Sequence, residues 1–235
     1  MNLLAALSLT IFKPTAPARP CILVLMTRTL YKSLIDSHPI ISDQIKRPAL
    51  AVVLRELEQV LANNVRGDIV EFGCYIGTTN LFMRRLLDQT NESITRHLHA
   101  YDSFAGLPPK TAADSSPAGL QFQAGELTVS KKQFLQEFQR AHLRPPIIHK
   151  AWFKALTAED VPAQIAYAFL DGDFYESIMT SLQLVWPRLS PGGVITIDDY
   201  QREALPGASR AVRDFCQNKP VTIHHEHNIG ILKAA

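Results

Sequence analysis

Apolar residues along this chain follow two spacings, one typical of amphipathic helices and one typical of buried strands. Residues 49–63 place their apolar side chains three and four positions apart, which predicts a helix with one buried face. Residues 68–72 and 165–170 are instead short apolar runs rich in β-branched and aromatic residues. Such runs predict strands that are buried on both faces of a sheet.

The alternation of strand and helix continues to the end of the chain. Two short β-type runs, 221–225 and 229–233, lie close enough together for an antiparallel hairpin. The alternation predicts an α/β fold with a doubly wound, mostly parallel sheet and right-handed crossovers. Further strands are expected at 97–101, 146–149 and 194–197, and further helices at 77–88, after Ser130, at 177–186 and at 208–217.

The length of 235 residues suits one domain, which we expect to span residues 26–235. The segment 1–25 carries a short apolar run with no Lys or Arg before it, and that run is far below the ~20 residues needed to cross a bilayer. We therefore expect 1–25 to be a poorly ordered extension. Residues 104–129 are rich in Pro, Gly, Ala and Ser, and a loop of this length inside a domain is usually functional or disordered.

Composition and charge narrow the classes of partner. The net charge of +2, without a block of Lys or Arg, argues against a nucleic-acid partner, and no segment predicts stable insertion into a membrane. The three cysteines show no C-x-x-C spacing and are expected to be reduced thiols of a cytoplasmic protein. The sequence leaves the oligomeric state open and is compatible with a homo-oligomer.

A glycine-containing run follows the first predicted strand, and we expect Glu71, Gly73, Tyr75 and Gly77 to contribute to a ligand site there. The run differs from the dinucleotide fingerprint G-x-G-x-x-G, and bulky residues stand where a pyrophosphate would approach the backbone. A nucleoside without phosphates fits better. Asp102, at the end of the second strand, could accept hydrogen bonds from ribose hydroxyls. The structural alternative is that the glycines only permit close packing and Asp102 caps a turn.

Three aspartates follow two later strands. If these strands are neighbours, Asp171 and Asp198 converge at one edge of the sheet, and Asp199 could turn toward them. Three carboxylates without a nearby His or Cys favour Mg²⁺, which would also relieve their mutual repulsion. The alternative is a solvated strand end at Asp198 and Asp199, with Asp173 as a helix cap.

Five strings, taken together, resemble the macrocin O-methyltransferase family. The likeness covers the chain from about Pro48 to the C-terminus. The strings are Glu71-Phe-Gly-x-x-x-Gly77, Tyr101-Asp-Ser-Phe-x-Gly-Leu-Pro108, Ala151-Trp-Phe153, Leu170-Asp-Gly-Asp-x-Tyr-Glu-Ser177 and Pro191-Gly-Gly-x-x-x-x-Asp-Asp-Tyr200.

The resemblance implies a class I methyltransferase fold with a seven-stranded sheet, S-adenosylmethionine and Mg²⁺ as cofactors, and a small-molecule acceptor that carries a sugar hydroxyl. It also implies the three aspartates as metal ligands, Asp171 as the catalytic base, and cofactor contacts from Asp102 and Ser103. Trp152 could form a wall for the adenine, or could belong to the core. Ser130 either touches the cofactor or only caps its helix.

Two other functions are compatible with parts of the sequence. Asp171-Gly172-Asp173 matches the D-x-D motif with which many glycosyltransferases hold a metal and a nucleotide sugar. That interpretation leaves the glycine run and the Asp198–Asp199 pair unexplained. A non-catalytic protein that binds S-adenosylmethionine is the second alternative, and it would show no methyl transfer with any acceptor.

Overall fold

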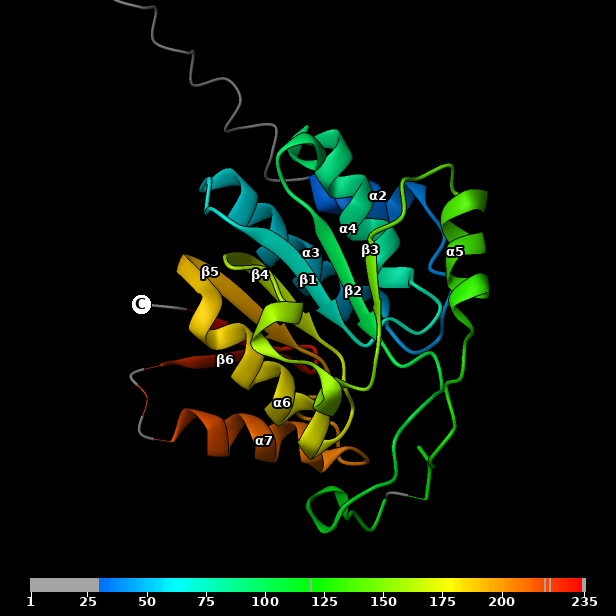
Figure 1. Cartoon of the computed structure of the whole chain (residues 1–235), viewed down its shortest axis with the longest axis vertical. Coiled ribbons are helices and arrows are strands. Elements are labelled where there is room, and N and C mark those ends of the chain that lie inside the picture. The colour runs from blue at the N-terminus through cyan, green and yellow to red at the C-terminus, as the bar shows by residue number, and fades with distance from the viewer. Residues whose placement is uncertain (1–29, 119, 218, 220, 234–235) are drawn as a thin grey trace, which may run out of the picture.

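A computed structural model describes residues 30–118, 120–217, 219 and 221–233 of the chain (Figure 1). The expected N-terminal extension, 1–25, lies outside these residues. Within them, seven strands form one sheet in the order β3-β2-β1-β4-β5-β7-β6. The strands are β1 (Asp68–Phe72), β2 (Leu98–Asp102), β3 (Ile147–Lys150), β4 (Ile165–Leu170), β5 (Leu189–Ile197), β6 (Ile223–Glu226) and β7 (Ile229–Lys233).

Strands β1 to β5 are parallel to one another, whereas β7 runs antiparallel to β5 and pairs with β6 as a terminal hairpin. Helices cover both faces of this sheet (Figure 1). The predicted doubly wound α/β fold, with its antiparallel C-terminal hairpin, is therefore confirmed. One face carries α2 (Leu30–Ser37), α3 (Arg47–Ala62), α4 (Thr78–Gln89) and α5 (Lys131–Arg140), and the other carries α6 (Tyr175–Val185) and α7 (Pro206–Cys216).

The central strands form the core because they carry almost no polar side chains. Every residue of β4 is buried, and from Tyr167 to Leu170 successive residues pack alternately against the two helical layers. Tyr167 is the polar residue of this strand, and its hydroxyl is satisfied by the Val53 carbonyl and the Thr196 hydroxyl. A sheet that is apolar on both faces needs helices on both, which is the arrangement observed.

Two elements differ from the sequence-based expectations. Helix α2 was not expected, because its eight residues are too few for a periodic pattern; the Glu58 carboxylate accepts hydrogen bonds from the Leu30 and Tyr31 N–H groups at its start. Strand β5 begins at Leu189 rather than at the expected residue 194, and so includes the Pro191-Gly192-Gly193 stretch. Among the described residues, no helix combines the length and the apolar character that crossing a membrane requires.

Candidate active site

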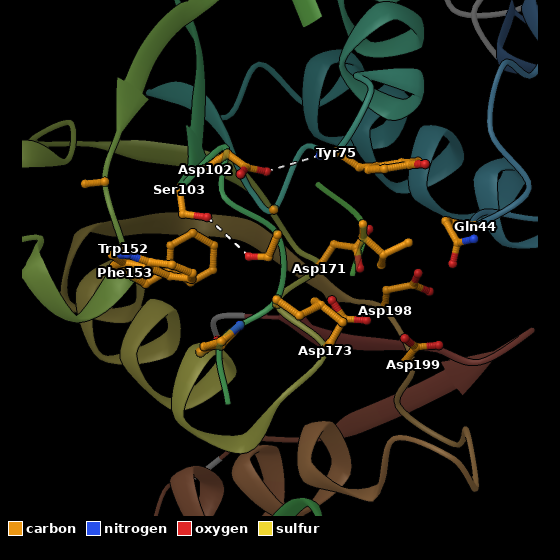
Figure 2. A pocket seen from close by; sticks show the side chains of 18 of the residues that line it. Gln44, Tyr75, Asp102, Ser103, Trp152, Phe153, Asp171, Asp173, Asp198 and Asp199 are labelled. Carbon is orange, nitrogen blue, oxygen red and sulfur yellow. Dashed lines mark hydrogen bonds between the residues drawn. The ribbon is translucent and has the colours of Figure 1, made fainter. Parts of the chain in front are cut away.

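The carboxyl ends of β1, β2, β4 and β5 meet around one pocket (Figure 2). This is the edge at which open α/β sheets bind ligands. The predicted site residues that line it are Gly73, Tyr75, Asp102, Ser103, Trp152, Asp171, Asp198 and Asp199.

The turn after β1 passes very close to the end of β4. Gly73 has φ +89°, and a Cβ at this position would lie 1.8 Å from the Asp171 carbonyl oxygen. The strands hold this approach in place, since the Asp171 N–H donates to the Phe72 carbonyl over 2.8 Å. Glycine is therefore required at 73 for two independent reasons, its backbone conformation and the space available.

Asp102 fastens the same turn to β2. Its carboxylate accepts hydrogen bonds from the backbone N–H groups of Cys74 (2.8 Å), Tyr75 (3.1 Å) and Phe104 (2.7 Å). Three donors leave roughly one of the four acceptor positions of a carboxylate free. Asp102 thus shapes the loop and still offers an acceptor toward the pocket that it lines (Figure 2).

Two predicted cofactor residues lie behind the pocket, outside its described lining. Glu71 is 1% exposed, and its carboxylate accepts a hydrogen bond from the Asn80 side chain. Burial raises the pKa of Glu71 well above its usual value. Gly77 precedes α4 with φ +92°, where a Cβ would lie 2.8 Å from the Phe134 ring. Both residues therefore shape the loop through contacts outside the described pocket lining.

The opposite wall of the pocket is aromatic. Trp152 is 38% exposed and lies beside Phe153, whose ring packs edge-on against Phe72. Ser103 lines this side too, and its hydroxyl donates to the Gly106 carbonyl (3.3 Å). Ser130 takes the other of its two expected roles: its hydroxyl caps α5 by accepting from the Gln133 N–H, and it is outside the pocket lining as described.

Four aspartates gather at the ends of β4 and β5 (Figure 2). Strand residues Leu170 and Ile197 are paired, so Asp171 and Asp198 follow at the same level of the sheet. One carboxylate oxygen each from Asp171, Asp173 and Asp199 lies within 4.8 Å of the others. Asp198 is outside this closest trio, but it is 8% exposed and lines the same pocket.

Asp173 joins the group because its backbone is left-handed, with φ +58°, as is that of Asp199 with φ +54°. Sequence reasoning placed Asp173 at a helix cap or in a D-x-D motif, so its participation was not expected with the other three. The D-x-D spacing was the available signal. Non-glycine residues with positive φ are uncommon and cluster at functional sites.

The acidic cluster is electrostatically unfavourable without a cation. Burial, followed by repulsion from the neighbouring carboxylates, raises the pKa of Asp171 and of Asp173 well above the usual value. Burial and Asp199 raise the pKa of Asp198 to about 8. Arg202 offsets part of this negative charge, because its guanidinium lies 3.1 Å from the Asp199 carboxylate. An all-oxygen donor set of this kind fits a hard divalent cation such as Mg²⁺.

A second hollow of about 790 Å³ adjoins this pocket. Gln44, Leu127, Asp198, Asp199 and Arg202 line both. The walls of the hollow come from the segments 43–49, 121–127, 198–202 and 227–228. Gln44 and His227 were not predicted as site residues, because only the tertiary fold brings the entry to α3 and the β6–β7 turn to the acidic cluster.

The long loop 104–129 is ordered by one buried carboxylate. Asp114 is 2% exposed and accepts hydrogen bonds from Thr111 and from the Tyr175 N–H that begins α6 (2.7 Å). A Cβ on Gly207 would lie 1.9 Å from its Oδ1. The loop is thereby fixed against α6 and α7, so its later part, 121–127, forms a defined wall of the hollow.

Several known proteins are similar in sequence to this chain. An 8-demethyl-8-(2,3-dimethoxy-alpha-L-rhamnosyl)-tetracenomycin-C 4'-O-methyltransferase of Streptomyces olivaceus is 35% identical over 165 residues, which are 68% of this chain and 61% of that protein. A demethyldecarbamoylnovobiocin O-methyltransferase of Streptomyces niveus is 30% identical over 164 residues, 68% of this chain and 62% of its own. The chain thus matches less than two thirds of the length of these relatives.

Solved structures agree on the fold. The O-methyltransferase NovP superimposes with a TM-score of 0.69 at 25% identity, over 79% of each chain. The calicheamicin methyltransferase CalS11 superimposes with a TM-score of 0.68 at 18% identity, over 95% of this chain and 99% of that one, which shows a common fold. The sheet is therefore that of the class I methyltransferases. The sequence profile of the macrocin-O-methyltransferase (TylF) family matches residues 39–228, and the chain belongs to that family.

Proposed function

We propose that this protein is an S-adenosylmethionine-dependent, Mg²⁺-dependent O-methyltransferase that acts on a hydroxyl group of a sugar or of a natural-product glycoside in the cytoplasm. One observation carries the proposal: the pocket at the glycine turn and the adjoining hollow share Asp198 and Asp199 in their walls. A cofactor in the pocket and an acceptor in the hollow would meet at these carboxylates.

The pocket offers the chemistry that adenosylmethionine needs. The free acceptor position of Asp102 can take a ribose hydroxyl, while Gly73 and Tyr75 let the ligand approach the backbone. Trp152 presents an exposed aromatic face suited to the adenine, and Ser103 lies beside it. We propose these five residues as the cofactor contacts and assign Glu71, Gly77 and Ser130 to shaping the surrounding loops.

The acidic cluster is the proposed metal site. Asp171, Asp198 and Asp199 are the proposed ligands, and Asp173 lies close enough to two of them to replace Asp198 in the inner set. A bound Mg²⁺ would lower the pKa of the acceptor hydroxyl and orient it. The raised pKa values of these carboxylates favour the proposal, because a cation offsets the repulsion that burial imposes on them.

The transfer itself is an in-line displacement, for which positioning supplies much of the rate. The acceptor oxygen forms a bond to the methyl carbon, and the carbon–sulfur bond breaks to leave S-adenosylhomocysteine. Asp171 lines the cofactor pocket close to Asp199 of the wall that the two cavities share, and we assign it the proton that the hydroxyl loses. Asp173 is the second candidate for this role, since its oxygen lies within 4.8 Å of that of Asp171.

The names of the relatives support the acceptor class, since one is described as a methyltransferase of a rhamnosyl tetracenomycin. The glycosyltransferase alternative would use Asp171 and Asp173, but it gives no role to the Gly73 turn or to Asp198. The non-catalytic alternative gives no role to the hollow beside the acidic cluster.

The test compares the single variants Asp171→Asn, Asp173→Asn, Asp198→Asn and Asp199→Asn with Asp88→Asn, a control on the surface of α4. We expect loss of methyl transfer by about 100-fold or more in the metal and base variants, with S-adenosylhomocysteine affinity retained. If Asp173→Asn lost more methyl-transfer activity than Asp171→Asn, the catalytic base would be assigned to Asp173 instead. Full turnover of the wild type in excess chelator would contradict the metal proposal.

A further inference from the structure

A third hollow, of about 680 Å³, has Arg202 in its wall and none of the four clustered aspartates. Segments 115–117, 200–203 and the first two turns of α7 form its walls, together with His225 of β6. Arg202 lines this hollow as well as the cofactor pocket and the acceptor hollow. The three cavities therefore meet at one side chain.

The charge of this hollow is opposite to that of the acidic cluster. Arg202, Arg210 and Arg213 line it, and Glu203 is the one carboxylate among its described lining residues. Arg202 is paired with Asp199. Within the described part of the chain, the polar contacts of Arg210 are with the Ala113 and Ser115 carbonyls, and that of Arg213 is with the Ser209 hydroxyl. Neither of these two cations forms an ion pair with a carboxylate of the described residues.

These two arginines are spaced to hold two anionic groups. Arg210 and Arg213 stand three positions apart on α7, so they share a helix face with their Cβ atoms about 5–6 Å apart. Guanidinium groups bind phosphoryl oxygens in bidentate fashion, and neighbouring phosphoryl groups of a diphosphate match such a pair. Tyr200 lines the same hollow and carries a hydroxyl group, and the positive end of α7 adds to the attraction.

We propose that this hollow, which we term the α7 anion site, binds the diphosphate of an acceptor whose sugar hydroxyl lies at the acidic cluster. The inference rests on the proposed function and makes it more specific, because the acceptor becomes a nucleoside diphosphate sugar. Arg202 would then be placed between the diphosphate and the aspartates, since its guanidinium is paired with Asp199 and the residue also lines the α7 anion site. Repulsion between the acceptor and the acidic cluster is thereby reduced.

Calorimetric titration of the protein with inorganic pyrophosphate, in saturating S-adenosylhomocysteine and at constant ionic strength, tests the site directly. We expect saturable binding that Arg213→Gln weakens by about tenfold and Arg213→Glu abolishes. The matched control is Arg140→Gln, which removes an exposed arginine of α5 far from the hollow. Pyrophosphate affinity that is equal in the wild type and in Arg213→Gln would overturn the proposal, as would the absence of binding.

Three further titrations identify which kind of anionic ligand the site binds. UDP-glucose should bind more tightly than methyl glucoside, and that advantage should disappear in Arg213→Gln. Equal affinity for inorganic sulfate and pyrophosphate would contradict the diphosphate assignment. In the glycosyltransferase alternative, UDP-glucose binding would instead need Mg²⁺ and would be lost in Asp173→Asn while Arg213→Gln retained it, which would also overturn the proposal.

Failure of the α7 anion site and failure of the proposed function give different results in these titrations. Loss of S-adenosylhomocysteine binding by the wild type would remove the methyltransferase assignment, whereas pyrophosphate binding depends on α7. A protein that binds S-adenosylhomocysteine but shows no Arg213-dependent binding of pyrophosphate would keep the proposed function and lose the α7 anion site.

Discussion

Gly73 and Asp171 are in contact through their backbones, and a single methyl group at position 73 would lie 1.8 Å from the Asp171 carbonyl oxygen. The contact joins the end of β1, which begins the cofactor loop, to the end of β4, which begins the acidic cluster. The cofactor side and the proposed metal side of the site are therefore coupled in position, and a shift in one displaces the other.

Gly73→Ala should consequently disturb both halves of the site. We expect the free energy of unfolding to fall by about 3 kcal/mol or more, since overpacking adds to backbone strain. The matched control is Gly125→Ala, because Gly125 has φ +84° and open space around it. That variant should lose only about 1–2 kcal/mol, the cost of the left-handed conformation alone. Chemical denaturation of the two variants measures the difference, and equal losses would contradict the close-contact account.

Asp102→Asn should weaken cofactor binding and loosen the loop together. The amide would keep one oxygen acceptor but place an NH₂ against a backbone N–H, so one of the three hydrogen bonds is replaced by a repulsive contact. We expect a loss of about 1–3 kcal/mol in stability and at least about tenfold in S-adenosylhomocysteine affinity. Calorimetry and thermal unfolding measure the two effects. Unchanged affinity would show that Asp102 does not contact the ligand.

Glu71→Gln separates support of the loop from contact with the cofactor. Burial raises the pKa of Glu71, so the folded protein retains a proton that the unfolded chain has already lost, and wild-type stability falls as pH rises above the ordinary glutamate value. Glutamine does not titrate, so the variant's stability does not fall with rising pH for this reason. The stability of Glu71→Gln relative to the wild type should therefore increase between about pH 5 and pH 8.

The affinity of Glu71→Gln for S-adenosylhomocysteine should stay close to that of the wild type, because Glu71 lies behind the described pocket lining. Asn80 can still donate to the glutamine oxygen. Calorimetry at neutral pH checks this part. A large loss of affinity in a variant that is stably folded would restore Glu71 as a direct cofactor contact.

Mg²⁺ should stabilise the protein through the acidic cluster. At a concentration of about 100 times its dissociation constant, a ligand specific for the folded state adds about 2.7 kcal/mol to the free energy of unfolding. Thermal unfolding with and without Mg²⁺, at matched ionic strength, should show a rise in the wild type and little rise in Asp199→Asn. An equal rise in the unfolding temperature of both proteins would show that the stabilising Mg²⁺ binds outside the acidic cluster.

Much of this site follows from strand order. The apolar runs predicted β1 and β4 with the observed bounds, and parallel pairing of β4 with β5 brings Asp171 and Asp198 together, as expected from their positions. The inclusion of Asp173 could not be derived in this way, because it depends on a left-handed turn rather than on strand alternation.

Residues that enter from distant segments were beyond sequence reasoning for a different physical reason. Gln44 reaches the acidic cluster from the segment before α3, and His227 reaches the hollow from the β6–β7 turn. No local pattern marks either residue, since their placement depends on long-range packing. Trp152 and Ser103 both line the pocket, and their cofactor contacts stay predictions; Ser130 caps its helix, as its sequence context also allowed.

The most direct measurement is a calorimetric titration of the purified protein with S-adenosylhomocysteine, accompanied by the Asp102→Asn variant and a check that both are folded. The account predicts micromolar binding by the wild type and a marked loss in the variant, because the pocket at the end of β1 and β2 is the proposed cofactor site. Absence of binding by the folded wild-type protein would contradict the central claim.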